Sequence, residues 1–507
     1  MIRLKTTLTT AAVATALLAG IGVAVAEPAE TEMAERGGLS RYYDQRLEWT
    51  GCDHEQLDAV GAQCANVTVP LDYRKPRGRT ITVAISRLKA EDPARRRGIM
   101  LSNPGGPGGA GLDLMLVVKE RMSPAVRAQY DLIGMDPRGI GRSSPVDCDW
   151  SVGTMLRSGG VDRAGFDRAV ALQADLAKRC ADRESDRLPH ITTRNTARDM
   201  DVIRGAMGER RVSYFGWSYG TYLGAVFTEM FPQRADRVVL DSAIDPREYG
   251  YDMFRDMGVP NEAALTAWAE WTAQHHAEYQ LGTTAKQVRA GVEALIQRSA
   301  RTPIRIGDHR LDDNSVPTLL FGPLADPRGY PLLAAQVREL TDAAAGKLVR
   351  PSPELDAALR FMFGPGAHED GDGQAAVLCG DASYSHDPES YWRHIQRSRA
   401  TQPVFGAFAN NITACAFWAR PVERPTVVHN HSPALIVQAT GDTRTAYSQG
   451  VGLHKVMKGS RLVTLKDVAV HAVFGNYPNT CAENAVNTYF ADGTLPATDI
   501  TCHDETR

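Results

Sequence analysis

The sequence has almost no excess of charge of either sign. Its 507 residues carry 57 lysines and arginines against 60 aspartates and glutamates, which gives a formal net charge of −3. The basic residues are scattered along the chain, so no segment favours binding to nucleic acid. With 43% hydrophobic and 23% charged residues, the composition is that of a folded globular protein. Disordered, collagen-like and coiled-coil chains are therefore excluded for the sequence as a whole.

Long hydrophobic runs are lacking beyond the N-terminal segment. Residues 1–26 begin with two basic residues, continue with an apolar run over 11–25, and end with Ala24-Val25-Ala26. This pattern predicts a secretory signal peptide that is cleaved after Ala26. A membrane anchor is the alternative, but the apolar run is short for a span and glycines interrupt it. We therefore expect a secreted, extracellular protein that is not attached to a membrane after cleavage.

The sequence contains eight cysteines, but no two of them have the Cys-x-x-Cys spacing of zinc or redox sites. An even number of cysteines in an exported chain indicates disulfide bonds. Many pairings are open in principle, and we favour the pairing of sequential neighbours. That choice predicts four local disulfides: Cys52–Cys64, Cys148–Cys180, Cys379–Cys415 and Cys481–Cys502.

Short strand-like runs alternate with helical patterns in two parts of the chain. The strand-like runs are residues 79–88, 98–102, 130–134, 212–215, 238–240, 434–438 and 462–465. The helical patterns are residues 193–207, 263–279, 285–299, 332–344, 353–362 and 448–457. Alternation of this kind predicts an α/β fold with a mostly parallel central sheet and helices on both faces.

The alternation is lost in the middle of the chain, where helical patterns dominate. This change predicts one sheet domain that is interrupted by a helical insert. The expected parts are a signal peptide 1–26, an N-terminal arm or pro-segment 27–50, the first part of the core 51–245, a helical cap 246–425 and the second part of the core 426–507.

The motif with the strongest chemical implication is Gly216-Trp217-Ser218-Tyr219-Gly220, which fits the pattern G-x-S-x-G. A predicted strand precedes it and a helical pattern follows it, which is the context of a nucleophile elbow. The elbow places the serine hydroxyl at a helix N-terminus, where backbone N–H groups favour developing negative charge. The alternative is a glycine-containing turn with an incidental serine. We predict that Ser218 is a nucleophile.

A serine nucleophile needs a histidine base, and the base needs an acid that orients it. In folds with this elbow, the order along the chain is serine, acid, histidine. Asp442 follows the next-to-last predicted strand and His471 follows the last one, so both are expected at the carboxyl edge of the sheet. Asp241 and Asp245, which follow an earlier strand, are the alternatives for the acid.

A glycine-rich segment, residues 103–111, follows the early strand 98–102. It lacks the Gly-Lys-Ser/Thr ending of a phosphate-binding loop and does not fit G-x-G-x-x-G. Glycines allow backbone N–H groups to approach a substrate carbonyl closely, so the segment predicts an oxyanion loop. The expected donors are the N–H groups of Gly106 and Tyr219. A second cluster, residues 136–143, is interpreted as structural, with charged side chains that brace the oxyanion loop.

Taken together, these motifs resemble the secreted tripeptidyl aminopeptidases and the proline-iminopeptidase-like members of the α/β-hydrolase superfamily. The resemblance covers roughly residues 50–505, and it includes the early cysteine pair. The segments that carry it are Asn103-Pro104-Gly105-Gly106-Pro107-Gly108, Asp136-Pro137-Arg138-Gly139-Ile140-Gly141, Gly216-Trp217-Ser218-Tyr219-Gly220-Thr221-Tyr222-Leu223-Gly224, Cys379-Gly380-Asp381 and Gly441-Asp442-Thr443.

The resemblance implies an α/β-hydrolase fold with a helical lid, the triad Ser218, Asp442 and His471, and the oxyanion donors Gly106 and Tyr219. The family often has Gly-His-Gly around the histidine, whereas this chain has Val470-His471-Ala472. The lid in such enzymes can carry carboxylates that hold a substrate ammonium group. Asp381 is a candidate for that role, and a structural role beside a disulfide is its alternative.

The activity that the resemblance implies is that of an exported serine exopeptidase. It would release short peptides, namely tripeptides, from free N-termini through an acyl-enzyme intermediate. Its partners would be peptide substrates, and we expect a monomer without a cofactor or a metal. A secreted carboxylesterase with the same fold and triad is one alternative, because the same chemistry serves both activities. A non-catalytic binding protein on a hydrolase scaffold is another.

Overall fold

The structure is a computed structural model that describes residues 38–363 and 371–505. The predicted signal peptide, residues 1–26, lies outside the described residues, as do residues 27–37 of the predicted arm. The chain divides into two compact units, Met1–Arg41 and Tyr42–Arg507, and only residues 38–41 of the first unit are described. The sheet and the helices that carry the candidate site all belong to the second unit.

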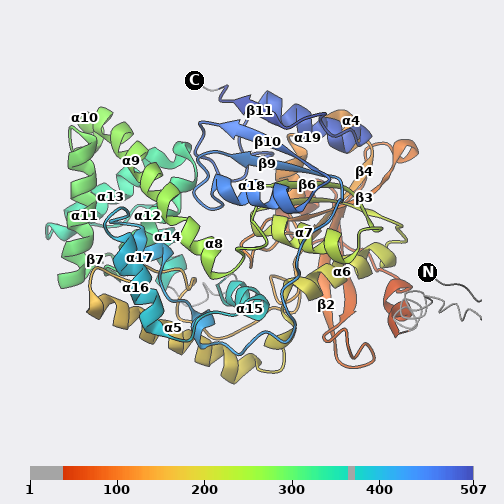
Figure 1. The fold of residues 1–507 in the computed structure, drawn as a ribbon, viewed down its shortest axis with the longest axis horizontal. Coiled ribbons are helices and arrows are strands. Elements are labelled where there is room, and N and C mark those ends of the chain that lie inside the picture. The colour runs from red at the N-terminus through yellow and green to blue at the C-terminus, as the bar shows by residue number, and fades with distance from the viewer. Residues whose placement is uncertain (1–37, 364–370, 506–507) are drawn as a thin grey trace, which may run out of the picture. The chain divides into compact units, whose positions relative to one another are not determined.

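A nine-stranded sheet forms the centre of the second unit (Figure 1), with the strand order β1-β2-β4-β3-β5-β6-β9-β10-β11. β2 runs antiparallel to both of its neighbours, and all other pairs are parallel, so the prediction of a mostly parallel sheet is confirmed. The strands are β1 Gln63–Pro70, β2 Thr80–Leu88, β3 Gly98–Asn103, β4 Tyr130–Met135, β5 Val212–Trp217, β6 Ala235–Asp241, β9 Ala434–Ala439, β10 Ser460–Lys466 and β11 Ile500–His503.

Helices cover both faces of the sheet, as the sequence predicts. The central strands β3, β4 and β9 are buried along their whole length, which explains why their sequences are continuous apolar runs. On one face, Val118, Phe215, Val437 and Val486 belong to one buried cluster. The helices on that face are α3 Leu114–Lys119, α4 Pro124–Arg127 and α19 Thr480–Asp492, and those on the other are α6 Thr193–Ala206, α7 Tyr219–Met230 and α18 Tyr447–Val456.

Helices dominate the described secondary structure between β6 and β9, and this segment has a core of its own. In Figure 1 its helices gather beside the sheet. Buried residues of this second core include Leu265, Trp268, Leu333 and Leu359. The helices are α8 Tyr251–Asp256, α9 Gly258–Gln274, α10 His276–Tyr279, α11 Ala285–Arg301, α12 Val316–Phe321, α13 Tyr330–Ala344, α14 Pro353–Phe363, α15 Gly371–Asp381, α16 Pro388–Ser398 and α17 Gly406–Ala409; a short hairpin joins β7 Ile304–Ile306 to β8 His309–Leu311.

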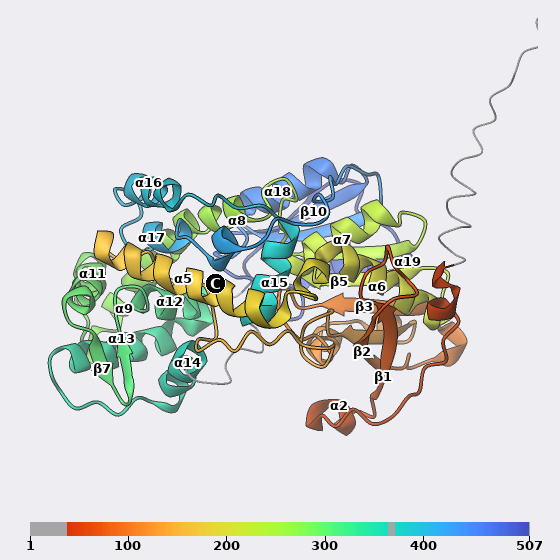
Figure 2. The ribbon, with the colours of Figure 1, turned by 90° about the horizontal axis from the view of Figure 1, so that it is seen from below.

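One long helix outside this segment packs against it. α5, Arg163–Glu184, precedes β5 in the chain and lies within residues 51–245, the predicted first part of the core. Figure 2 shows α5 running along the helices of the insert. Phe166 of α5 shares a buried cluster with Tyr391 and Ile395, and the amide of Asn314 donates to the carbonyl of Gly165 at 3.1 Å. The helical layer therefore includes α5, because its apolar face meets α16 rather than the sheet.

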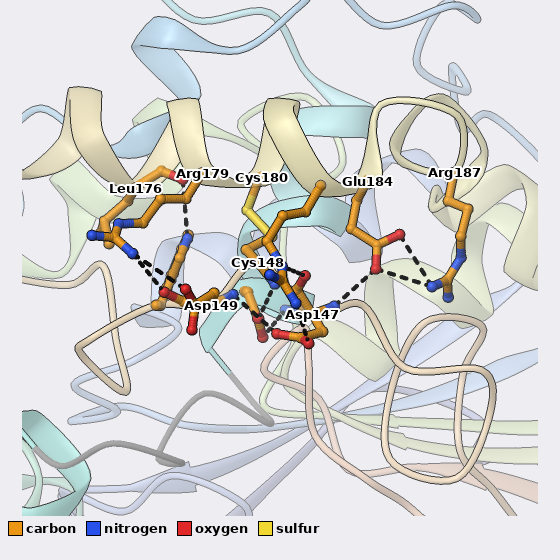
Figure 3. The surroundings of a disulfide bond; sticks show 12 residues. Asp147, Cys148, Asp149, Leu176, Arg179, Cys180, Glu184 and Arg187 are labelled. Atoms are coloured by element: carbon orange, nitrogen blue, oxygen red, sulfur yellow. Dashed lines mark hydrogen bonds and ion pairs between the residues drawn. A yellow bond between two sulfur atoms is a disulfide. The ribbon is translucent and has the colours of Figure 1, made fainter.

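The four disulfides predicted from sequential pairing are confirmed: Cys52–Cys64, Cys148–Cys180, Cys379–Cys415 and Cys481–Cys502. The disulfide Cys148–Cys180 fastens a loop to α5 (Figure 3). Beside it, Arg179 donates to the carbonyl of Asp149 at 3.0 Å, and the indole N–H of Trp150 donates to the carbonyl of Leu176 at 3.0 Å. Within residues 38–363 and 371–505, no helix is long and apolar enough to cross a bilayer.

Removal of the disulfide Cys148–Cys180 is expected to destabilise the helical layer. The bond closes a loop with a sequence separation of 32, and the loss of such a constraint costs about 3–4 kcal/mol in the chain-entropy model. The double variant Cys148→Ser/Cys180→Ser should therefore unfold at a lower urea concentration in near-UV circular dichroism. Cys481→Ser/Cys502→Ser, with a separation of 21, is the control at the far side of the sheet. An unchanged unfolding midpoint for the first variant would show that polar contacts alone hold this loop.

Candidate active site

Ser218 lies in the sharp turn between β5 and α7, as the G-x-S-x-G pattern predicts. Its backbone φ is +54°, a left-handed conformation that costs energy for a residue with a side chain. The turn is so tight that a Cβ atom at Gly216 would lie 2.5 Å from the carbonyl oxygen of Gly220. Only glycine fits at that position, and the serine side chain is left partly exposed at the start of α7.

The glycine-rich loop after β3 lies directly against this turn. Gly105 has φ +100°, and a Cβ atom at Gly105 would lie 2.7 Å from the Cβ atom of Ser218. The same position is 3.2 Å from the backbone nitrogen of Tyr219, one of the two predicted oxyanion donors. The N–H of Gly105 donates to the side-chain oxygen of Asn103 at 3.0 Å, so Gly106 offers the next N–H in the loop. The loop and the elbow thus meet around Ser218.

Asp442 and His471 are hydrogen-bonded to each other. The Nδ1 atom of His471 lies 2.9 Å from both carboxylate oxygens of Asp442, which is fully buried. Asp442 also accepts hydrogen bonds from the hydroxyl of Thr445 at 2.9 Å and from the backbone N–H of Arg444 at 2.8 Å. Burial alone would raise the pKa of Asp442, but the nearby His471 and these hydrogen bonds outweigh burial and lower the pKa below its ordinary value.

The strand register brings the loops that carry these residues to one edge of the sheet. Ser218, Asp442 and His471 follow β5, β9 and β10, whose carboxyl ends lie side by side with that of β6. The N–H of Ser218 donates to the carbonyl of Asp241 at 3.0 Å, and the indole of Trp217 donates to the carbonyl of Phe474 at 3.1 Å. At these carboxyl ends, Trp217 of β5 pairs with Asp241 of β6, Asp241 pairs with Val437 of β9, and Ala439 of β9 pairs with Leu465 of β10.

The alternative acids have other partners. Asp241 is buried and accepts the backbone N–H groups of Val473 and Phe474 at 3.0 and 2.6 Å, so it braces the turn after His471. Asp245 forms an ion pair with Arg247. In the part of the chain that the structure describes, Asp442 is the carboxylate that hydrogen-bonds the imidazole of His471.

The turn after His471 also explains the local departure from Gly-His-Gly. Ala472 has φ +66°, which is the left-handed region that favours glycine. Its backbone N–H donates to the hydroxyl of Ser242 at 2.8 Å, which holds the alanine in this conformation. The chain therefore keeps the backbone conformation that glycine favours while carrying an alanine.

Asp241 is expected to make stability depend on pH. Burial raises its pKa to about 6, against hydrogen bonds from Val473, Phe474 and Ser242 that lower it. Because the folded state holds this proton more tightly than the unfolded chain, Asp241 favours folding at low pH, and the contribution is lost as pH rises through about 6. Between pH 4 and 6, the midpoint temperature of thermal unfolding should therefore fall less for Asp241→Asn than for the wild type. Parallel pH curves for the two proteins would contradict the prediction.

The insert contacts both of the loops that carry Asp442 and His471. The backbone N–H of His471 donates to the carbonyl of Ala325 at 3.0 Å, in a turn of the insert between α12 and α13. The guanidinium of Arg444 stacks on the ring of Phe321 at 3.4 Å from its centroid, and it donates to the carbonyl of Gly322 at 3.0 Å. Sequence analysis missed these contacts, since no motif marks Arg444 or Ala325 as partners.

The cluster 136–143 has the structural role that the sequence predicts. The buried carboxylate of Asp136 accepts the backbone N–H groups of Gly111 and Arg142, each at 2.8 Å. Arg138 is buried and pairs with Asp199 at 2.5 Å. The hydrogen bond from Gly111 to Asp136 holds the end of the glycine-rich loop 103–111. Among the described residues, no group of three or more histidine, cysteine, aspartate or glutamate side chains is arranged to hold a metal ion.

Comparison with known proteins agrees with the α/β architecture and identifies a smaller group of similar proteins within that fold. A model described as alpha/beta hydrolase fold matches residues 98–302, and one described as TAP-like protein matches residues 402–502. Tripeptidyl aminopeptidase of Streptomyces lividans is 33% identical over 483 residues, which cover 90% of this chain and 86% of that protein. Serine protease Hip1 of Mycobacterium tuberculosis is 29% identical, covering 92% and 93%. Carboxylesterase B of M. tuberculosis is 30% identical, covering 90% and 89%.

Proposed function

The chain belongs to the tripeptidyl aminopeptidase-like family of α/β-hydrolases, and from this membership we propose that it is a serine exopeptidase that releases tripeptides from free N-termini. The observation that carries the proposal is the hydrogen-bonded pair of His471 and Asp442 at the same sheet edge as the Ser218 elbow, in a chain similar to a tripeptidyl aminopeptidase along 90% of its length.

We propose the following roles for these residues. The Oγ atom of Ser218 attacks the carbonyl carbon of the scissile amide, and its proton passes to Nε2 of His471. Asp442 holds the imidazole by Nδ1 and stabilises the imidazolium that forms. The N–H groups of Gly106 and Tyr219 bind the oxygen of the tetrahedral intermediate.

The second half of the reaction uses the same groups. His471 returns the proton to the leaving nitrogen, the carbon–nitrogen bond breaks, and the shortened peptide departs with a new N-terminus. A water molecule, deprotonated by His471, then attacks the carbonyl carbon of the acyl-enzyme. The ester bond to Ser218 breaks, His471 returns the proton to the Oγ atom of Ser218, and the short peptide is released. Each step uses side chains and backbone N–H groups of this chain together with water.

The position of the insert supports cleavage near a chain end. Ala325 of the insert contacts His471, and Asp381 of α15 contacts Thr193, whose hydroxyl hydrogen-bonds Tyr219. The insert thus contacts the loop of His471 and, through Thr193, the start of α7. A site bordered in this way favours the end of a peptide over the middle of a long chain. We also propose that the enzyme is secreted, which agrees with four disulfides, since these persist in oxidising compartments.

The experiment that tests the proposal compares chromogenic amides with one, two or three N-terminal residues, each with a free and an acetylated amine. We expect the free tripeptide amide to be cleaved fastest and acetylation to reduce turnover strongly. Mass spectrometry of a longer free peptide should show a product ladder with steps of three residues, absent with Ser218→Ala. Equal turnover of acetylated substrates would refute the aminopeptidase. Hydrolysis of short acyl esters without any peptide cleavage would favour the carboxylesterase instead.

A further inference from the structure

A buried chain of hydrogen bonds links the insert to the residue that follows the nucleophile. Asp381, the last residue of α15, accepts the hydroxyl of Thr193 at 2.5 Å and the backbone N–H of Thr193 at 2.7 Å. The hydroxyl of Thr193 lies 2.6 Å from the hydroxyl of Tyr219, the first residue of α7. Asp381, Thr193 and Tyr219 are 6%, 1% and 1% exposed, so water does not compete for these bonds.

The direction of the chain follows from counting protons. At a pH above the pKa of Asp381 the carboxylate is ionised and only accepts hydrogen bonds, so the single hydroxyl proton of Thr193 is donated to Asp381. The hydroxyl of Thr193 must then accept from Tyr219, whose phenol is the donor. The phenol of Tyr249 also donates to the carboxylate of Asp381, at 3.1 Å. Asp381 is thus the terminal acceptor of a chain that begins on Tyr219.

We propose that Asp381, acting through Thr193, is a positioning residue that fixes Tyr219 so that its backbone N–H points at the substrate carbonyl oxygen. This inference rests on the proposed role of Tyr219 as an oxyanion donor. Tyr219 has its phenol at one end of the buried chain and its backbone N–H at the elbow, so the chain restrains the residue that carries the proposed donor. A displacement of about 1 Å in a catalytic group can cost about 10²-fold in rate.

Two other features support the proposal. The disulfide Cys379–Cys415 lies two residues before Asp381 and ties α15 to the neighbouring turn, which restrains the carboxylate. Burial raises the pKa of Asp381 to about 7, against hydrogen bonds from Thr193 and Tyr249 that lower it. Through Thr193, this buried aspartate is linked to a residue of the proposed oxyanion hole. Its contacts also differ from the amine-binding role that the resemblance suggests, because its oxygens face Thr193 and Tyr249.

The test uses pairs of matched variants. Thr193→Val removes the hydroxyl with little change in shape, and Thr193→Ser keeps it. We expect kcat to fall about 10- to 100-fold in Thr193→Val and in Asp381→Asn, with KM changed less than about threefold, and kcat to be largely kept in Thr193→Ser. Tyr219→Phe should lower kcat similarly, and adding Asp381→Asn to it should lower kcat little further, because both changes break one chain. Tyr249→Phe is the control that removes a donor from Asp381 and leaves the chain intact.

Two readouts separate this proposal from the proposed function. Hydrolysis of 4-nitrophenyl acetate reports Ser218 chemistry even if no peptide is cleaved. Binding of phenylboronic acid, which forms a tetrahedral adduct with a serine, reports the oxyanion hole without turnover and should weaken in parallel with kcat. Full kcat and boronate affinity in Thr193→Val would overturn the proposal, as would multiplicative effects of Tyr219→Phe and Asp381→Asn. Absence of peptide cleavage by the wild type would overturn only the exopeptidase.

Discussion

Replacement of Ser218 by alanine is expected to lower kcat for a free tripeptidyl amide by about 10³-fold or more. In the proposed mechanism the hydroxyl of Ser218 forms the acyl-enzyme, so its removal abolishes that step. Substrate binding does not require that hydroxyl, so KM should change little. The turn itself should tolerate the change, because the φ of +54° at residue 218 costs alanine and serine about the same.

The measurement pairs steady-state kinetics with active-site labelling. A fluorophosphonate should add its mass to the peptide that contains Ser218 in the wild type and fail to label Ser218→Ala. Ser448→Ala is a suitable control, because Ser448 is an exposed serine on α18. Turnover that survives in Ser218→Ala would point to another nucleophile. A folded wild type that takes up no label would instead favour the binding protein without catalysis.

Replacement of Asp442 by asparagine is expected to lower kcat by about 10³- to 10⁴-fold, for esters as well as amides. In the proposed mechanism Asp442 accepts the Nδ1 proton of His471, which leaves Nε2 free to take the proton of Ser218. An asparagine amide can donate to Nδ1 and would then favour the other tautomer. The buried site has further donors, from Arg444 and Thr445, that also face the side chain, so part of the stability is expected to be lost.

Asp241→Asn is the matched control, and it decides between the two acids that the sequence leaves open. Asp241 is equally buried and lies at the same edge, but it binds the backbone after His471 and not its ring. We expect a loss of kcat that is at least tenfold smaller than in Asp442→Asn. A larger loss in Asp241→Asn than in Asp442→Asn would transfer the role of the acid to Asp241.

Local patterns predict a large part of this fold. Each of the seven strand-like runs coincides with a strand of the sheet, and the helical pattern 285–299 lies within α11, Ala285–Arg301. Sequence patterns also predict that Ser218, Asp442 and His471 lie at one edge of the sheet. Each of these residues follows a strand, and parallel strands end at a common edge. Sequential pairing of cysteines succeeded for the same reason, since each pair joins elements that are close along the chain.

What the sequence does not predict depends on partners far apart in the chain. α5 has an apolar face, but nothing in its sequence says that Phe166 meets Tyr391, more than two hundred positions later. Asp381 and Thr193 are separated by 188 positions, and each alone has the features of an ordinary helix end. Periodicity identifies the buried face of an element, and only the packed structure identifies what covers it.

The contact between His471 and Ala325 has a consequence for anyone who engineers new specificity by exchanging lids. A lid from a related enzyme would bring its own backbone to the turn 323–325, and the N–H of His471 would meet an altered acceptor. Phe321 would be replaced at the same time, and Arg444 would lose the ring on which it stacks. Grafted lids should therefore keep residues 321–325 of the recipient, with junctions placed on either side of that turn. Chimeras built this way would gain the pocket of the new lid, and His471 would keep its position.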